Sequence, residues 1–176
     1  PLNDLFTTYF RLHLSKSFYH KDVLNLLSQP FLKQLLSQEA IKAISEYITK
    51  HNLTYISREK LLQATPENQH EVFKLLFPEK EQDKTRNVAF ISKLIENAIT
   101  IIYRLKSYID PENSQHILVQ EYAYRFYELF NQLKQLQDRY HYIDSVKILY
   151  HFYLDVLQKS ALNFRGEPLE GLQVMG

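Results

Sequence analysis

The fold is decided by residues 85–140, which read TRNVAFISKLIENAITIIYRLKSYIDPENSQHILVQEYAYRFYELFNQLKQLQDRY. Two segments, Thr85 to Ile109 and Glu112 to Tyr140, place apolar residues at alternating spacings of three and four, the spacing of one helix face. The stripes are Val88, Ile91, Ile95, Ala98, Ile102, Leu105 and Ile109 on the first segment, and Val119, Tyr122, Phe126, Leu129, Leu133, Leu136 and Tyr140 on the second. Asp110-Pro111 suits a tight turn, because aspartate caps a helix and proline fits its first turn. The two segments therefore predict an antiparallel helix pair packed through both stripes.

Shorter helices are predicted before this pair. Asn3 or Asp4 would cap a first helix, and Ser37 and Ser57 would cap two later ones, because their side-chain oxygens can accept the free N–H groups of a helix start. The apolar face of the first helix would carry Leu5, Phe6, Tyr9, Phe10 and Leu12. These signals predict several short helices rather than one long one.

The remaining segments complete the expected architecture. Thr65-Pro66-Glu67 combines a cap, a first-turn proline and an early acid, so a helix is expected to start there. Leu53 to Ile56 alternates over too few residues for a strand and is interpreted as an extended connector. A final helix is expected from about Asp144. The predicted fold class is all-α, an irregular multi-helix bundle of about eight or nine helices with a short C-terminal extended segment.

Composition favours a single globular domain. The chain can bury roughly two-thirds of its unfolded surface, and 45% of its 176 residues are hydrophobic. Lys plus Arg number 21 against 20 for Asp plus Glu, a balance that argues against a dedicated electrostatic nucleic-acid binder. No apolar run approaches the length of a bilayer span, so we expect no membrane contact. The lack of cysteine excludes disulfides and thiolate zinc sites, and we expect a cytoplasmic location.

No catalytic or metal-binding motif can be assigned. None of the seven histidines lies in H-E-x-x-H, and no two are spaced i, i+4 as ligands on one helix face would be. Glu79, Glu81 and Asp83 cluster, but Lys80 and Lys84 alternate with them, which is typical of a solvated charged loop. No glycine precedes residue 166, so a glycine-rich phosphate loop is excluded before that point. We therefore assign no catalytic, cofactor-binding or metal-ligating residue.

Aromatic residues are abundant, with 13 Tyr and 11 Phe. The densest cluster is Tyr122, Tyr124, Phe126, Tyr127 and Phe130. Bases stack on such rings, so a platform for single-stranded nucleic acid is one interpretation. Arg125 is the only cation inside the cluster, which favours the other interpretation, aromatic packing between helices with hydroxyls at the rim.

The C-terminal tail differs in composition from the rest of the chain. All three glycines, Gly166, Gly171 and Gly176, lie there, and glycine and proline oppose helix continuation. Leu172 to Met175 is typical of a buried strand. We therefore expect a helical unit over residues 1–162 and a separate segment over 163–176. Because the sequence starts at Pro1, we also expect it to be a piece of a longer protein.

Both ends of the chain resemble one protein family. FRGEPLEGLQVMG (164–176) resembles the segment leading into helicase motif V in the AddB-type branch of the UvrD-like superfamily I helicases. PLNDLFTTYFRLHL (1–14) and FYHKDVLNLLSQPF (18–31) resemble the helical segment entered after motif IV in the same proteins, while the middle matches only in being helical. The resemblance implies that residues 1–162 are a helical insertion subdomain between these motifs. Residues 163–176 would then be a linker and the first half of a strand of the neighbouring RecA-like domain.

The resemblance also implies a function in DNA double-strand-break processing and recombinational repair. Proteins of this family process broken DNA ends, many carry a C-terminal PD-(D/E)XK nuclease domain, and AddB-type members often have a degenerate ATPase site. The parent would be an ATP-dependent exodeoxyribonuclease using ATP and magnesium. Its remaining domains would be the partners of this chain, which would meet DNA through them. None of the catalytic parts map onto these 176 residues, so we expect the isolated chain to be non-catalytic and without cofactor.

A second hypothesis comes from a different class of protein. The chain would then be a free-standing helical protein-interaction module with no nucleic-acid role, and the resemblance of its tail would be a coincidence. A metal-dependent or hydrolytic enzyme is a third hypothesis with little support from the sequence. Under the first hypothesis, the tail strand of the isolated chain lacks its sheet, and we expect fragments to dimerise through that exposed edge.

Overall fold

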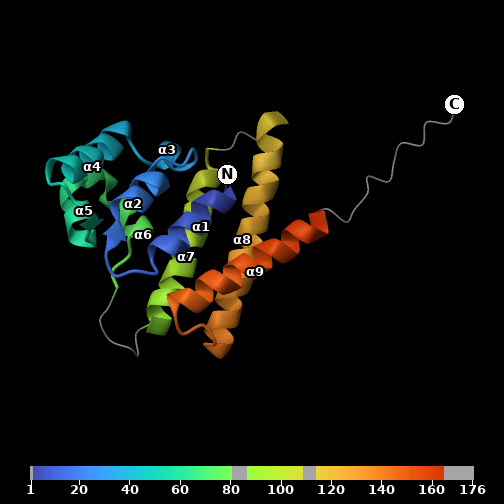
Figure 1. The fold of residues 1–176 in the computed structure, drawn as a ribbon. Helices are drawn as coiled ribbons and strands as arrows, with labels where there is room; N and C mark the ends of the chain where they lie inside the picture. The colour runs from blue at the N-terminus through green and yellow to red at the C-terminus, as the bar shows by residue number, and fades with distance from the viewer. Residues whose placement is uncertain (1, 81–86, 109–113, 165–176) are drawn as a thin grey trace.

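The computed structural model describes residues 2–80, 87–108 and 114–164, and excludes the side chains of 114–118 and 160–164. Within these ranges the chain forms nine α-helices and one small sheet, which confirms the predicted all-α class (Figure 1). The elements in chain order are α1 (Leu2–Leu12), β1 (Phe18–Tyr19), α2 (His20–Leu27), α3 (Leu32–Leu35), α4 (Gln38–Lys50), β2 (Tyr55–Ile56), α5 (Arg58–Ala64), the 3-10 turn η1 (Glu67–Gln69), α6 (His70–Leu76), α7 (Asn87–Lys106), α8 (Ser114–Tyr140) and α9 (Val146–Phe164).

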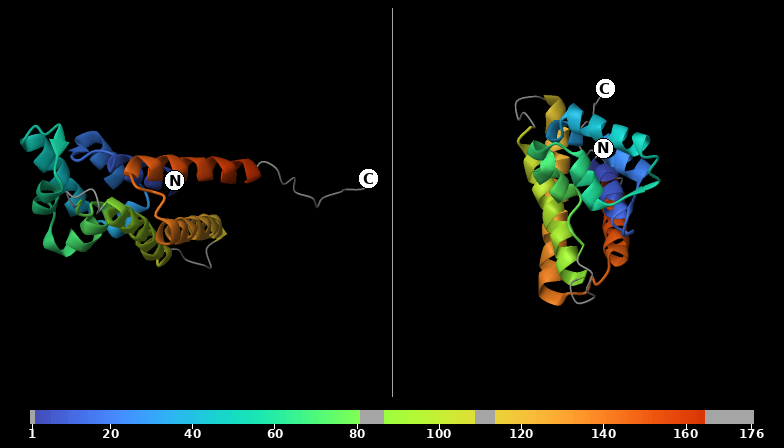
Figure 2. Two further views of the ribbon diagram at one scale, coloured as in Figure 1. Left: turned by 90° about the horizontal axis from the view of Figure 1, so that it is seen from below. Right: turned by 90° about the vertical axis from the view of Figure 1, so that its left-hand side faces the viewer.

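Helix α1 lies at the centre of the molecule. The short helices α2 to α6 gather on one side of it, and the long helices α7, α8 and α9 lie on the other (Figures 1 and 2). Its predicted apolar face is confirmed, since Leu5, Phe6, Tyr9, Phe10 and Leu12 are all buried. The ring of Phe6 packs edge-on against Phe130 of α8 at 4.8 Å between centroids, and Phe10 lies 5.0 Å from Tyr153 of α9. One helix therefore joins the two halves of the core.

The predicted antiparallel pair is formed by α7 and α8 (Figure 1). On α7 the predicted stripe is buried from Ile91 to Leu105. On α8 the prediction was only partly right, because three of its members, Tyr122, Leu136 and Tyr140, are 40%, 43% and 46% exposed. The face that α8 buries consists of Ala123, Phe126, Phe130, Leu133 and Gln137. The predicted Asp110-Pro111 turn lies outside the described residues.

Two predicted helix caps are confirmed, the predicted cap before the first helix was wrong, and the start predicted at Pro66 was partly right. Ser37 Oγ accepts the N–H of Ala40 at 3.1 Å, and Ser57 Oγ accepts that of Lys60 at 3.5 Å. Asn3 does not precede α1 but lies within it, where its Oδ1 accepts the Thr7 hydroxyl at 3.0 Å. The segment after Pro66 first forms the 3-10 turn η1, and α6 begins only at His70.

The small antiparallel sheet corrects the expectation of a connector at Leu53 to Ile56. Tyr55 pairs with Tyr19 and Ile56 pairs with Phe18, so two short extended segments satisfy each other's backbone groups. Phe18 and Ile56 are buried, which fixes the register through their contact with the core. The pairing joins two segments far apart in the sequence, and a local pattern over four residues cannot reveal it.

Buried polar groups tie α1 to α6 and α7. The Tyr9 hydroxyl can donate its proton to the carbonyl oxygen of Leu75 at 3.3 Å or to that of Leu94 at 3.5 Å, and Asn97 Nδ2 donates to Leu75 at 3.0 Å. His13 Nε2 lies 2.9 Å from the carbonyl oxygen of Leu76, to which the neutral ring can donate. These contacts satisfy carbonyls at the end of α6 that its own helix leaves free.

The end of the chain bears on the predicted domain boundary. Helix α9 continues to Phe164, two residues beyond the boundary that composition predicts, and the predicted strand at 172–175 lies outside the described residues. Beyond its contact with α1, the last part of α9 projects away from the bundle (Figure 2). Within the ranges described, no helix is long and apolar enough to cross a bilayer.

Candidate functional site

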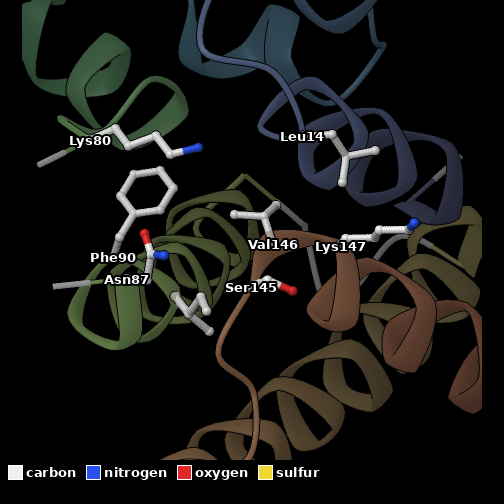
Figure 3. A pocket seen from close by; sticks show the side chains of 8 residues that line it. Leu14, Lys80, Asn87, Phe90, Ser145, Val146 and Lys147 are labelled. Carbon is white, nitrogen blue, oxygen red and sulfur yellow. The ribbon is translucent and has the colours of Figure 1, made fainter. Parts of the chain in front are cut away.

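A basic pocket lies where α1 ends, α7 begins and α9 begins (Figure 3). It has a volume of about 190 Å³, and its floor is apolar, formed by the buried side chains of Phe90, Ile91 and Val146. Polar groups lie around the rim. They are contributed by Lys80, Asn87, Ser145 and Lys147, with Leu14 closing the side toward α1. The volume is smaller than the ~300–1,000 Å³ of typical small-molecule sites, so the pocket does not resemble an enclosed substrate cavity.

The charge around this pocket is positive. Lys80 Nζ lies 5.6 Å from the centroid of the Phe90 ring, and Lys16 is close enough for its charge to act on Lys80. Burial and, second, the charge of Lys16 lower the pKa of Lys80, because both disfavour the ammonium form. Among the described residues, no carboxylate makes an ion pair with Lys16, Lys80 or Lys147. An anion at this rim would relieve the repulsion between the lysines.

The start of α9 is capped by Ser145. Its Oγ accepts the N–H of Ile148 at 3.3 Å, and its carbonyl accepts the N–H of Leu149 at 3.0 Å. The cap fixes the position at which Val146 and Lys147 enter the helix, next to the pocket. Among the described residues, the rim offers ammonium, amide and hydroxyl donors and is lined by no carboxylate, a set that suits an anion rather than acid–base catalysis.

A stacked pair of tyrosines lies at the end of α8, a few residues before Ser145 of the pocket rim. The rings of Tyr140 and Tyr142 are 5.2 Å apart between centroids and only 5° from parallel. His141 between them has φ of 51°, a left-handed conformation that ends α8 and turns the chain back. Tyr142 is 76% exposed, the highest value among the large apolar and aromatic side chains described. The guanidinium carbon of Arg139 lies 5.9 Å from the Tyr140 ring centroid.

Gln137 holds the loop that carries Tyr142. Its Nε2 donates to the carbonyl of Ile143 at 2.8 Å, and its Oε1 accepts the N–H of Ile143 at 3.1 Å. The side chain is 1% exposed, so both bonds are shielded from water. This pair of bonds acts as a clamp between the last turn of α8 and the segment leading to Ser145.

Gln137→Leu is expected to lower the free energy of unfolding by about 2 kcal/mol, because it leaves a buried N–H and a buried C=O of Ile143 without a partner. The measurement is urea denaturation followed by circular dichroism. Gln135→Leu is the matched control, since Gln135 is exposed on the same helix. Equal midpoints for the two variants would contradict the clamp.

The aromatic cluster considered in the sequence is divided by the structure. Phe126 and Phe130 are core residues, whereas Tyr122, Tyr124 and Tyr127 are 40%, 57% and 41% exposed. Arg125 Nη2 is held by Glu121 Oε1 at 2.6 Å in an i, i+4 pair. Core packing therefore accounts for the two phenylalanines, and the three tyrosines lie at the surface.

The charged cluster considered in the sequence lies mostly outside the described residues. Glu79 is exposed, and Glu81, Asp83 and Lys84 lie outside the described residues. In the part of the chain that the structure describes, no three His, Asp or Glu side chains are placed to hold a metal ion. Sequence reasoning missed Tyr142, Arg139 and Lys147, which share no motif. The available signal was the spacing Arg139-Tyr140-x-Tyr142 directly after a long helix.

Comparison with known proteins supplies no relative. No protein-family model, no curated protein and no solved structure matches this chain.

Proposed function

We propose that the chain is a non-catalytic helical subdomain of a helicase/exonuclease-like protein that processes DNA double-strand breaks in recombinational repair. The observation that carries the proposal is the packing of the first helix against the last. The Tyr153 hydroxyl of α9 donates to the carbonyl of Asn3 in α1 at 3.4 Å, across 150 residues of sequence. A helical unit inserted into another domain must enter and leave its host on one side, and the start of α1 lies against α9, eleven residues before that helix ends at Phe164.

The resemblance of both chain ends to segments around helicase motifs IV and V supports the same proposal. In this proposal the RecA-like domains of an AddB-type parent bind ATP and magnesium, and no residue of this chain takes part in that chemistry. The parent's other domains are the partners of the subdomain, and its place of action is the cytoplasm. The basic rim formed by Lys80 and Lys147 is the surface through which the subdomain would approach DNA.

A free-standing protein-interaction module remains the second candidate, and the surface of α8 and α9 favours it. Exposed large apolar and aromatic side chains lie on these helices, whereas those of the short helices α2 to α6 are buried or partly buried in the described ranges. The residues concerned are Tyr122, Tyr124, Tyr127, Leu136, Tyr140, Ile148 and Phe152. Exposed apolar groups of this kind mark protein contact surfaces. In the first proposal, a neighbouring domain of the parent covers them.

The experiment compares the full-length gene product with this chain alone. We expect the full-length protein to unwind or degrade linear duplex DNA in an ATP-dependent way, and the isolated chain to hydrolyse no ATP and cleave no DNA, because it offers no phosphate loop or magnesium ligand that we can assign. ATP hydrolysis by the isolated chain, lost on a point substitution within it, would contradict the proposal. A full-length protein without activity on DNA ends would favour the interaction module.

A further inference from the structure

We infer that the end of the bundle formed by the α8–α9 loop binds single-stranded DNA, with a base stacked on Tyr142 and the strand passing over the lysine rim of the basic pocket. This inference rests on the proposed function, because it names the form of DNA that the subdomain would contact.

The ring of Tyr142 has one face open for stacking. Its other face is covered by Tyr140, parallel to within 5°, while 76% of the side chain remains exposed. A tyrosine that is already backed by a second ring is held in one orientation, so a base can continue the stack with little further loss of side-chain entropy. Stacking of bases on exposed aromatic rings is the common device of single-strand binding proteins.

Two cations and one hydroxyl lie close to this stack along the chain. The cations are Arg139, which lies beside Tyr140, and Lys147, which follows Tyr142 by five residues. The hydroxyl is that of Ser145 at the pocket rim. The three residues from Tyr142 to Ser145 span at most about 11 Å even when fully extended. The stack and the pocket rim are therefore close enough for neighbouring nucleotides of one strand to reach both.

The two lysines of the rim hold their ammonium groups at separate places. In Figure 3, Lys80 extends over Phe90 toward the gap beside Leu14, and Lys147 extends away from Lys80 on the other side of Val146. Two ammonium groups separated in this way are poorly placed to chelate one compact anion. They suit a chain of phosphates, each of which meets one cation.

A single strand fits this surface better than a duplex does. The bases inside a duplex are already stacked on each other and cannot cover the ring of Tyr142, and a net charge of +1 gives the chain little general hold on duplex phosphates. Three carboxylates of the described residues are close in sequence to these groups. Asp138 is paired with Lys134 at 2.8 Å, whereas Glu79 and Asp144 are exposed.

The test is fluorescence anisotropy with a labelled oligothymidine of about 15 nucleotides, the upper range for one single-strand binding surface. Tyr142→Ala is expected to weaken binding by about tenfold, the typical effect of losing one stacked base, while Tyr142→Phe keeps the ring and should bind like the original chain. Tyr103→Ala is the matched control, since Tyr103 is 71% exposed on α7. Removing its ring should leave the dissociation constant unchanged.

The lysine rim is tested by salt dependence. Replacing Lys80 and Lys147 together by Ala should lower the slope of log K against log salt by about 0.7 for each phosphate that a lysine no longer neutralises. Lys60→Ala with Lys106→Ala removes two exposed ammonium groups elsewhere and is the matched control. Thermal midpoints equal to that of the original chain would show that each variant is folded.

Three outcomes would overturn the inference. The first is that no binding is seen at a chain concentration of about 100 µM, which is the weak limit of non-specific association. The second is that Tyr142→Ala and Tyr103→Ala change the dissociation constant equally. The third is that a duplex competitor binds more tightly than the single strand. The proposed function is tested separately by the full-length protein. Activity on DNA ends without Tyr142-dependent binding would leave the proposed function standing and refute the inference. Tyr142-dependent binding of the single strand by a full-length protein without activity on DNA ends would support the inference and refute the proposed function.

Discussion

Phe130→Ala is expected to lower the free energy of unfolding by about 3–5 kcal/mol, the usual cost of removing an enclosed phenylalanine. The Phe130 side chain is fully buried and contacts four other rings at centroid distances of 4.8 to 6.1 Å. These rings belong to Phe6, Phe10, Phe126 and Tyr153, on three different helices. Alanine would leave a cavity at the point where α1, α8 and α9 meet. Urea denaturation of the original chain and of Phe130→Ala measures the difference between their free energies of unfolding.

The control for this variant is Tyr124→Ala, because Tyr124 is a ring of similar size on the same helix but is 57% exposed. Its effect should stay within about 0.5 kcal/mol, as for surface positions in general. Phe126→Ala should resemble Phe130→Ala, since Phe126 is only 7% exposed and its ring lies 5.5 Å from Phe6. If the three variants unfold at the same urea concentration, the buried face of α8 has been placed wrongly.

Acid is expected to destabilise the chain through His13. Burial lowers the pKa of this ring from 6.5 to about 4, with an opposing effect from the Leu76 carbonyl and a smaller effect of the Lys80 charge in the same direction as burial. The unfolded chain therefore binds a proton at a higher pH than the folded chain does. The stabilisation is fully present above pH 6.5 and is lost as the pH falls, by about 2 kcal/mol at pH 5 and about 3 kcal/mol near pH 4.

The measurement is the free energy of unfolding at pH 7, 6 and 5 for the original chain and for His13→Gln, since glutamine can still donate to the Leu76 carbonyl but does not titrate. Between pH 7 and pH 5, the free energy of unfolding should fall by about 2 kcal/mol less in the variant than in the original chain. His151→Gln, whose ring is exposed on α9, is the control for general effects of losing a histidine. Parallel pH profiles for the original chain and His13→Gln would show that His13 does not carry the effect.

The helices could be predicted from the sequence where local chemistry decides them. Ser37 and Ser57 cap the helices that their positions indicate, because a cap depends on the three residues that follow it. Which residues of α8 are buried could not be predicted from the sequence, because the helices and the loop that pack against α8 decide it. Ala123 is buried because it is small enough to fit, and Gln137 is buried because Ile143 satisfies both ends of its amide. Gln137 is not apolar, and Ala123 lies one residue after Tyr122, the position that the alternating spacing selects.

The candidate site was beyond sequence reasoning for a related reason. Tyr142 meets Tyr140 because His141 adopts a left-handed conformation, which the spacing Tyr140-x-Tyr142 does not by itself indicate. Lys80 and Lys147 lie far apart in the chain and meet at the pocket only after α7 and α9 have packed. The sequence contained each of these residues but no indication that they are neighbours.

The central position of α1 has a consequence for how the protein is made. Its partners are widely separated in sequence, since Asn3 bonds to Tyr153 and Tyr9 bonds to Leu94, 150 and 85 residues away. At a synthesis rate of ~5–20 residues per second, roughly 8–30 s pass between the emergence of α1 from the ribosome and that of its last partner. During that interval Phe6 and Phe10 lack the α8 and α9 rings that enclose them. The apolar face of α1 is therefore made well before the helices that bury it, and the nascent chain exposes Phe6 and Phe10 until translation has passed α9.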